Sequence, residues 1–388
     1  MRIGEFSDSF IPVFDGVGRV VKAYCETLSR MGHEVYAIVP VDDTGYRGGL
    51  GYEIVDYWSA PISRKLPYRV GISGLDPHFD ERIKRINLDI CHVHSPAFAG
   101  WAGLSYAKKH HIPLVGTFHS KFYDDILQTT RSHTIASLGA RAVAEFFNAC
   151  DEVWAVSELS GQTLKDYGYK GQPVVMPNGT EFRTLEEGAS QEALSFYSID
   201  PDVPVLLFVG QINWKKNLRR IIESCAMLKK EGMAFQLVLA GRGPDEEAVR
   251  SLAHQCDLDD CFKMTGHIQS TRLLDGLYSI AELFMFPSIY DNAPMVVREA
   301  ANMHTPALTV KGSCAAEVIQ DQVNGLLAED DNQSVYEAVK SFLQSSKENR
   351  DKIAQKAFET IPVPWKGKLM ETVAQRYENL IQHSRRGY

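Results

Sequence analysis

The sequence predicts an α/β protein with two parallel-sheet domains in tandem. Short apolar segments alternate with amphipathic helical segments, this alternation occurs twice, and a stretch without periodicity separates the two series. Such alternation is typical of parallel sheets that are covered by helices on both faces. A length of 388 residues also fits two domains.

The first series covers the N-terminal half of the chain. Its strand patterns occupy residues 2–6, 34–40, 88–94, 112–118 and 152–157. Its helix patterns occupy residues 18–33 and 100–110. Because the strands are short and the helices between them are amphipathic, we expect one parallel sheet. This series predicts a Rossmann-like domain over residues 1–182.

The pattern then breaks and resumes. Residues 183–203 lack periodicity and are rich in Pro, Gly, Ser and acidic residues, which predicts an interdomain linker. Apolar strand patterns return at 203–210, 235–243, 261–268, 282–288 and 305–310, with helical patterns between and after them. We expect a second Rossmann-like domain over 204–365, and a final helix over 366–388 that packs back on the first domain. The active site is expected in the cleft between the domains.

Composition and charge exclude several classes of function. A formal net charge of −8 argues against nucleic acid as a partner, because phosphate binding needs a basic surface. No segment approaches the roughly 18 apolar residues of a membrane-spanning helix. The N-terminal residues lack a secretory signal pattern, and seven scattered cysteines fit reduced thiols. We therefore expect a cytoplasmic protein.

Two carboxylates, Asp291 and Glu299, stand eight positions apart between an apolar strand pattern and a helix pattern. In open α/β sheets, ligands bind outside the carboxyl ends of the strands, where such loops and helix starts meet. Carboxylates accept hydrogen bonds from paired hydroxyl groups. The arrangement therefore favours a ligand that contains a sugar or ribose.

An ordered set of motifs covers nearly the whole chain. It consists of the acidic pair and of the segments FIPVFDGVG (10–18), GTFHS (116–120), VMPNG (175–179), FVGQINWKKN (208–217), LAGRGP (239–244) and TGHI (265–268). With these motifs the chain resembles the retaining glycosyltransferases of family 4, which have the GT-B fold. The segments FHSKFYDD (118–125) and DNAPMVVREA (291–300) are most similar to bacterial enzymes that glucosylate diacylglycerol.

The resemblance assigns roles to the two carboxylates. It implies that Glu299 holds the ribose hydroxyls of a nucleotide; the alternative is an exposed glutamate on the helix surface. Asp291 matches an acidic residue, usually glutamate, that contacts the transferred sugar, and here it is one methylene shorter. The alternative for Asp291 is a loop aspartate that caps the following helix.

The diphosphate of such a donor needs positive charge, which also stabilises the leaving group. The resemblance places Lys216 on the phosphate lysine of the family, whereas Gln211 replaces the usual arginine, and Lys215 is a candidate to compensate. The alternative is a solvated lysine pair at a helix start, although the helix dipole disfavours cations there. Next to Asp291, a Gly-rich turn of the family is replaced here by a segment that contains Asn292 and Pro294.

Other expected donor-binding groups are mainly backbone groups. Met295 and Val296 supply amides at the predicted helix start, and the turns that contain Gly241, Arg242, His267 and Ile268 are expected to line the base pocket. Gly16 belongs to a Gly-containing turn that the family places beneath the donor phosphate; routine use of glycine in turns is the alternative. His119 is implied to touch the donor sugar, with a structural histidine as the alternative. His92 and His94 mimic a metal pair, but no third ligand is evident, and we expect core histidines.

The expected reaction is retaining transfer of a hexosyl unit from a nucleotide diphosphate sugar, with a UDP-sugar favoured, to an unknown acceptor hydroxyl. His119, Asp291 and Lys216 are the candidate catalytic residues. Asp291 is the only candidate for a covalent nucleophile, and the resemblance favours attack on the same face as the leaving phosphate. No cofactor or metal is expected. Two alternatives stay open: a nucleotide-sugar epimerase or hydrolase, and a non-catalytic nucleotide-sugar-binding subunit.

Membrane contact is a separate question. Residues 121–149 include an amphipathic helix pattern with Phe146 and Phe147 near its end. We expect ordinary packing against the sheet. Peripheral binding at the inner face of the membrane through this segment is the alternative, and a lipid acceptor would require it.

Overall fold

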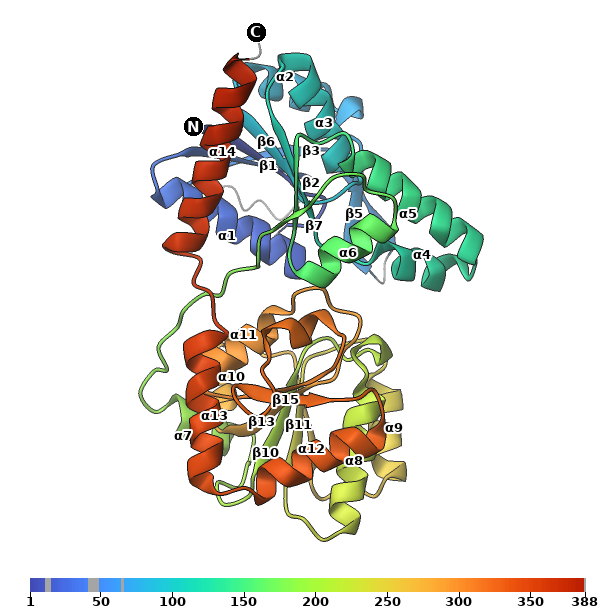
Figure 1. The fold of residues 1–388 in the computed structure, drawn as a ribbon, viewed down its shortest axis with the longest axis vertical. Helices are drawn as coiled ribbons and strands as arrows, with labels where there is room; N and C mark the ends of the chain where they lie inside the picture. The colour runs from blue at the N-terminus through green and yellow to red at the C-terminus, as the bar shows by residue number, and fades with distance from the viewer. Residues whose placement is uncertain (11–14, 41–48, 64–65, 387–388) are drawn as a thin grey trace. The chain divides into compact units, whose positions relative to one another are not determined.

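The computed structural model describes residues 1–10, 15–40, 49–63 and 66–386. The chain forms two compact units (Figure 1), Met1–Gly179 together with Pro364–Tyr388, and Thr180–Val363. Residues 183–203, which we expected to be a linker, lie within the second unit. They include helix α7 (Ala189–Phe196), which packs on α10 (Thr271–Ser279) so closely that a Cβ on Gly276 would meet the carbonyl oxygen of Ala189 at 2.2 Å.

The first unit contains a seven-stranded parallel sheet with the strand order β3-β2-β1-β6-β7-β8-β9. Its strands are β1 (Arg2–Phe6), β2 (Glu34–Pro40), β3 (Glu53–Tyr57), β6 (Ile90–Val93), β7 (Leu114–Phe118), β8 (Glu152–Ala155) and β9 (Val174–Val175). An antiparallel pair, β4 (Ser59–Ser63) and β5 (Leu66–Gly71), lies outside this sheet.

Helices cover this sheet (Figure 1). They are α1 (Gly16–Arg30), α2 (Pro77–Arg85), α3 (Phe98–His110), α4 (Phe122–Thr130), α5 (His133–Phe147), α6 (Glu158–Asp166) and α14 (Lys368–Arg386), with a 3-10 turn η1 (Ser73–Leu75). The C-terminal helix α14 packs on this unit, where Tyr377 is fully buried and Arg376 forms an ion pair with Glu152 on β8. The predicted α/β architecture is therefore confirmed.

The second unit has a six-stranded parallel sheet with the order β12-β11-β10-β13-β14-β15. Its strands are β10 (Val205–Val209), β11 (Gln236–Ala240), β12 (Phe262–Gly266), β13 (Ala281–Phe286), β14 (Ala307–Val310) and β15 (Gly325–Ala328). Besides α7 and α10, its helices are η2 (Trp214–Lys216), α8 (Leu218–Lys230), α9 (Glu246–Gln255), α11 (Met295–Asn302), η3 (Cys314–Val318), α12 (Asn332–Gln344) and α13 (Lys347–Thr360).

The central strands of the second sheet form its core. Leu206, Leu207 and Phe208 on β10 are fully buried, as are their neighbours on β11 and β13. Strands that are apolar on both sides bury surface against helices on both faces of the sheet, at roughly 25 cal/mol per Å² of apolar area. The sheet is therefore a rigid platform for the loops at its carboxyl edge.

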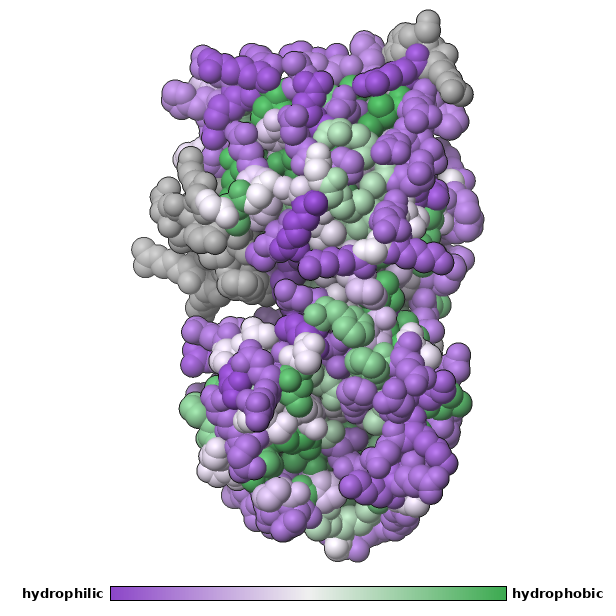
Figure 2. All heavy atoms as spheres, turned by 90° about the vertical axis from the view of Figure 1, so that its left-hand side faces the viewer, coloured by the Kyte–Doolittle hydropathy of each residue, from purple (hydrophilic) through white to green (hydrophobic). Residues whose placement is uncertain are grey.

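The surface is mostly hydrophilic where it can be seen. The face drawn in Figure 2 carries hydrophobic side chains in separate small groups among polar residues. Within the described residues, none of the helices has the length and apolar character needed to cross a membrane.

Candidate functional site

The carboxyl edge of the second sheet gathers most of the candidate residues. Strands β12, β11, β10 and β13 are neighbours in this order and run parallel, so the loops that follow them lie side by side. These loops carry Gln211 after β10, Arg242 after β11, His267 after β12 and Asp291 after β13. Gln211, Arg242 and His267 are exposed, and Ile268 is half-buried.

Backbone hydrogen bonds hold the segments after β10 and β11 together. Gly210 donates to the carbonyl of Ala240 at 2.9 Å, and Ile212 donates to the carbonyl of Arg242 at 3.0 Å. The close approach requires glycine at position 241, where φ is +144° and a Cβ would lie 1.8 Å from the Gly210 carbonyl oxygen. Gly241 is therefore needed for the shape of this edge, whichever ligand binds there.

Lys216 and Asp291 form a direct ion pair. Lys216 Nζ lies 2.5 Å from Asp291 Oδ1, and Ser288 donates its hydroxyl to Asp291 Oδ2 at 2.6 Å. The Lys216 and Asp291 side chains are 17% and 19% exposed, so solvent screens this pair only partly. The structure thus brings together two of the predicted catalytic residues, which are 75 positions apart in the sequence.

Asp291 does not cap the following helix, so this alternative interpretation is wrong. The N-cap of α11 is Pro294, and its side chain makes no capping hydrogen bond. The amides of Met295 and Val296 lie in the first turn of α11, where backbone N–H groups have no partner within the helix. Asn292 is buried, and its side-chain oxygen accepts a weak hydrogen bond from the Cys314 thiol at 3.8 Å.

Lys215 and Lys216 both lie near the ring of Tyr290. Lys215 Nζ is 4.5 Å from the ring centroid, and Lys216 Nζ is 5.8 Å from it. Both lysines lie in η2 and are half-buried. Two cations near a carboxylate and an aromatic face give this edge a local positive charge that an anionic ligand can use.

Glu299 is buried, with 4% of its surface exposed, so it is not an exposed helix-surface residue. It lies in the middle of α11, and Tyr278 donates its hydroxyl to Glu299 Oε2 at 3.4 Å. Burial alone would lower the pKa of Arg183, but its hydrogen bonds with Asp275 raise it above the usual value. The negative charge of Glu299 makes a smaller contribution in the same direction. A buried carboxylate next to a tyrosine hydroxyl is a polar group that suits hydroxyl recognition.

In the first unit, His119 follows directly after β7 and is half-buried. Its Nε2 lies 3.1 Å from Nδ1 of His94, and the two rings stack with centroids 5.3 Å apart. Burial lowers the pKa of His119 well below its usual value, and the neighbouring His94 and His92 reinforce this. His119 is therefore neutral at physiological pH.

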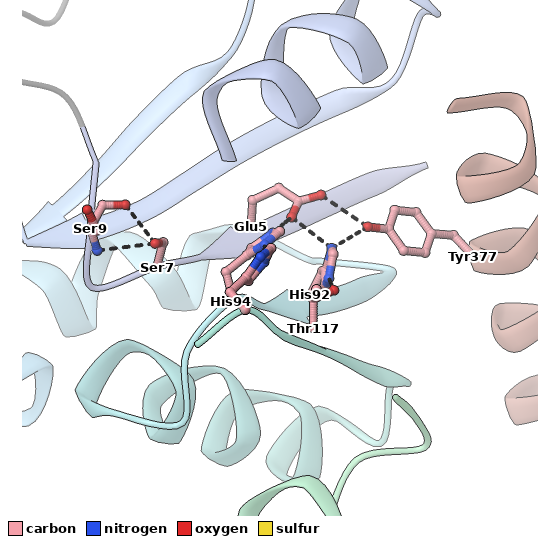
Figure 3. A network of polar contacts seen from close by, with 8 residues as sticks. Glu5, Ser7, Ser9, His92, His94, Thr117 and Tyr377 are labelled. Carbon is pink, nitrogen blue, oxygen red and sulfur yellow. Dashed lines mark hydrogen bonds and ion pairs between the residues drawn. The ribbon is translucent and has the colours of Figure 1, made fainter. Parts of the chain in front are cut away.

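His94 belongs to a buried polar network (Figure 3). Its Nε2 lies 2.8 Å from Glu5 Oε2, and Tyr377 on α14 contacts both Glu5 Oε1 at 3.2 Å and His92 Nδ1 at 2.6 Å. His92 Nε2 lies 2.7 Å from the hydroxyl of Thr117. His92 and His94 lie in the core, as expected. Glu5 is a third potential metal ligand, which the sequence did not reveal. One potential ligand atom from each of the three residues lies within 4.8 Å of the other two.

Glu5 and Tyr377 are the residues that the sequence reasoning missed. A charged residue within the apolar segment RIGEF was a usable signal, because a carboxylate on a buried strand needs partners. Nothing comparable in the sequence indicated that Tyr377 belongs to a buried polar network, because a tyrosine is common on an amphipathic helix.

Gly16 is the first residue of α1 and is exposed. A Cβ there would meet nothing within 4 Å, and the neighbouring Gly18 donates its amide to the N-cap side chain of Asp15 at 2.7 Å. Gly16 and Gly18 thus form the first helical turn and not a turn with left-handed glycines. The rest of the expected motif, residues 11–14, lies outside the described residues.

Comparison with known proteins identifies the class of protein. A model described as Glycosyltransferase Family 4 matches residues 14–182, and a model described as Glycosyl transferases group 1 matches residues 190–360. Two parallel-sheet units with this match define a GT-B glycosyltransferase. The chain belongs to glycosyltransferase family 4, and its reaction class is glycosyl transfer from a nucleotide sugar.

Relatives resemble the chain over most of its length. An alpha-monoglucosyldiacylglycerol synthase from Streptococcus pneumoniae is 24% identical over 369 residues, which are 92% of this chain and 82% of that protein. A GDP-mannose-dependent alpha-mannosyltransferase from Corynebacterium glutamicum is also 24% identical, over 99% of this chain and 88% of that one.

Solved structures share the fold at lower identity. Sucrose-phosphate synthase from Thermosynechococcus elongatus has a TM-score of 0.81 at 18% identity, covering 98% of this chain and 99% of that chain. HepE from Anabaena, solved in complex with UDP, has a TM-score of 0.76 at 15% identity, covering 98% of this chain and 100% of that chain.

Proposed function

We propose that the protein transfers a hexosyl unit from a UDP-sugar to an acceptor hydroxyl with retention of the anomeric configuration. The observation that carries this proposal is the carboxyl edge of the second sheet. There the Lys216–Asp291 ion pair joins the segments after β10 and β13, and Glu299 is buried in α11, the helix that follows Asp291. Positive charge for a diphosphate and a buried acceptor for hydroxyls occur together there. The solved complex of HepE with UDP supports the choice of uridine nucleotide.

We assign binding of each part of the donor to particular residues on this edge. Glu299 accepts hydrogen bonds from the ribose hydroxyls, while Lys215, Lys216 and the amides of Met295 and Val296 bind the diphosphate. Gln211 can donate a neutral hydrogen bond to the phosphate but contributes no charge.

Base recognition is assigned to the two outer loops of this edge. They contain Gly241 and Arg242 after β11, and His267 and Ile268 after β12. The backbone at Gly241 is shaped by its contact with Gly210, so we propose that backbone groups there read the base. In the first unit, Gly16 is proposed to lie near the donor phosphate, and His119 is proposed to contact the transferred sugar.

Asp291 is better suited to hold Lys216 than to act as a covalent nucleophile. Both of its carboxylate oxygens already accept hydrogen bonds, from Lys216 and from Ser288. When the donor diphosphate binds, it competes for Lys216, which then neutralises the negative charge that develops on the leaving phosphate. We therefore favour attack by the acceptor on the same face as the leaving group, with the phosphate accepting the acceptor proton. No metal is needed in this scheme.

One of these relatives supports a lipid as the acceptor class. The synthase from Streptococcus pneumoniae is named for a glucosylated diacylglycerol. In this chain Phe146 and Phe147 are buried and pack on Trp101 and Phe118, so these two phenylalanines are core residues and do not form a membrane contact.

The exposed face of α5 offers a different surface for lipid. Ile135 is 50% exposed and Leu138 is 60% exposed, three positions apart, with exposed Arg131 and Arg141 nearby in the sequence. Exposed apolar residues flanked by cations suit peripheral binding to anionic lipid. We propose peripheral contact at the cytoplasmic face of the membrane through this surface.

The test begins with donor binding. Thermal shift with UDP, GDP, ADP and their sugar conjugates identifies the base, since a ligand at a hundredfold over its Kd stabilises by about 2.7 kcal/mol. Glu299→Gln is expected to abolish the shift, whereas Glu348→Gln, the same change at an exposed position on α13, is the matched control. An unchanged shift in Glu299→Gln would refute the assignment of this edge.

Transfer is then measured with vesicles that contain diacylglycerol and with soluble glycans. Product with α configuration at the anomeric carbon supports retention. Release of free nucleotide without acceptor would favour the hydrolase or epimerase alternative. A thermal shift without transfer to any acceptor would favour the non-catalytic nucleotide-sugar-binding subunit. Activity lost in EDTA and restored by Mg²⁺ would refute the metal-free scheme.

A further inference from the structure

Three side chains in the first unit form a chain of hydrogen bonds that ends at His119. Glu5 lies on β1, His94 directly after β6, and His119 directly after β7, and these strands are neighbours in the sheet. Glu5 Oε2 is 2.8 Å from His94 Nε2, and His94 Nδ1 is 3.1 Å from His119 Nε2. Figure 3 shows Glu5 and His94 side by side within the buried network.

The protonation states along this chain follow from the donors and acceptors. Burial alone would raise the pKa of Glu5, but His92 and His94 outweigh it and lower that pKa to about 2, so Glu5 is an anion that only accepts. Burial lowers the pKa of His94 to about 4, and the electrostatic interaction with His92 adds to this effect. His94 is therefore neutral and carries one ring proton.

The anion at Glu5 determines where that proton lies. Because Glu5 can only accept, the proton of His94 lies on Nε2, which leaves a lone pair on Nδ1. This lone pair faces Nε2 of His119, so Nε2 of His119 is the donor and carries the single proton of that neutral ring. Nδ1 of His119 is then an acceptor.

We propose that Glu5, acting through His94, holds His119 as the tautomer protonated on Nε2, so that its Nδ1 accepts a hydrogen bond from a hydroxyl of the transferred sugar. The tautomer follows from the first unit alone; the contact with a sugar rests on the proposed function. Glu5 and His94 are positioning residues in this scheme, since only His119 touches the substrate.

The same network provides a matched control. Tyr377 contacts Glu5 through the other carboxylate oxygen, Oε1, and it contacts His92 but not His94. Removing its hydroxyl with Tyr377→Phe disturbs the buried network but leaves both partners of the Glu5–His94 bond in place. By contrast, Glu5→Gln removes the anion and introduces an amide N–H that can donate to His94 Nε2, which would reverse the tautomer of His94.

The experiment is nitrogen-15 NMR of histidine-labelled full-length protein, in which ring-nitrogen shifts separate protonated from unprotonated nitrogens. The chain has twelve histidines, and spectra of His94→Gln and His119→Gln assign the two that matter. We expect both rings to carry the proton on Nε2 in the wild type and in Tyr377→Phe. In Glu5→Gln, we expect a mixed or reversed tautomer at His119.

Several results would overturn the proposal. A wild-type His119 protonated on Nδ1 would do so even if Glu5→Gln fails to fold, as would a Tyr377→Phe spectrum that shifts like that of Glu5→Gln. One equivalent of zinc in the purified protein, lost in Glu5→Gln, would also overturn it, because the nitrogen of His94 that faces Glu5 would then be a metal ligand without a proton.

Kinetics separate this inference from the proposed function. We expect Glu5→Gln to lower kcat about tenfold, as for the loss of one hydrogen bond to the substrate, while UDP affinity is unchanged. A reversed tautomer without a change in kcat would refute the contact between His119 and the sugar, and would leave the role of Glu5 in setting the tautomer supported.

Discussion

Replacing Gly241 with alanine tests how the carboxyl edge of the second sheet is built. Position 241 has a φ of +144°, and the new Cβ would lie 1.8 Å from the carbonyl oxygen of Gly210, a separation that real Cβ atoms do not show. The two backbones must therefore move apart by about 1 Å or more. This movement strains the bonds from Gly210 to Ala240 and from Ile212 to Arg242.

The expected loss of folding stability in Gly241→Ala has two parts. A residue other than glycine at this φ costs on the order of 1–3 kcal/mol. Each backbone hydrogen bond lost at the edge costs about 1 kcal/mol more. We expect Gly241→Ala to destabilise the protein by about 4 kcal/mol and to displace the loop that carries Gln211.

Gly232→Ala is the matched control. Gly232 also has a positive φ, +77°, but a Cβ there would meet nothing within 4 Å. We expect Gly232→Ala to lose only the stability that results from the positive φ, about 1 kcal/mol. The assay is calorimetric unfolding of both variants, followed by titration with UDP. Equal losses in the two variants would refute the steric argument, and unchanged UDP binding in a folded Gly241→Ala protein would refute its place at the donor site.

Three further predictions follow from the charges and surfaces described above. Lys216→Ala should lower kcat about a hundredfold in steady-state transfer assays, because the leaving phosphate loses its cation; unchanged kcat would contradict this role. His94 stays neutral in the folded protein with a pKa of about 4, against 6.5 ordinarily. It therefore contributes about 3 kcal/mol of stability above pH 6.5, which is lost as the pH falls from 6.5 to 4; calorimetry of His94→Asn should show a weaker pH dependence. Leu138→Asp should reduce co-sedimentation with anionic vesicles, while Leu185→Asp, at an exposed position of the second unit, should not.

Local sequence patterns were sufficient for much of the fold. The apolar segments that become β10, β11 and β13 were predicted correctly, because an apolar run followed by a turn is a local signal of a buried strand. The short helix α7 lies in the segment that we predicted to be a linker. Its eight residues carry too little periodicity to show that it packs on α10 as part of the second unit.

The candidate site was predictable only in part. The positions of Asp291 and Glu299 were evident from a strand followed by a helix, but their environments were not. Asp291 could have been a helix cap, and the structure instead pairs it with Lys216, 75 positions away in the sequence. Glu299 could have been exposed, and it is buried because α11 turns this face toward Tyr278.

By itself the sequence determined the alternation of strands and helices, the negative net charge, and the loops in which chemistry would lie. These properties depend on the composition and on contacts within a few residues. The tertiary structure alone decided which polar groups meet. Glu5 and Tyr377 are 372 positions apart, yet they share one hydrogen bond, because a parallel sheet brings distant strands together and α14 packs on that unit. A buried charge specifies only that it needs a partner, and the fold determines which one.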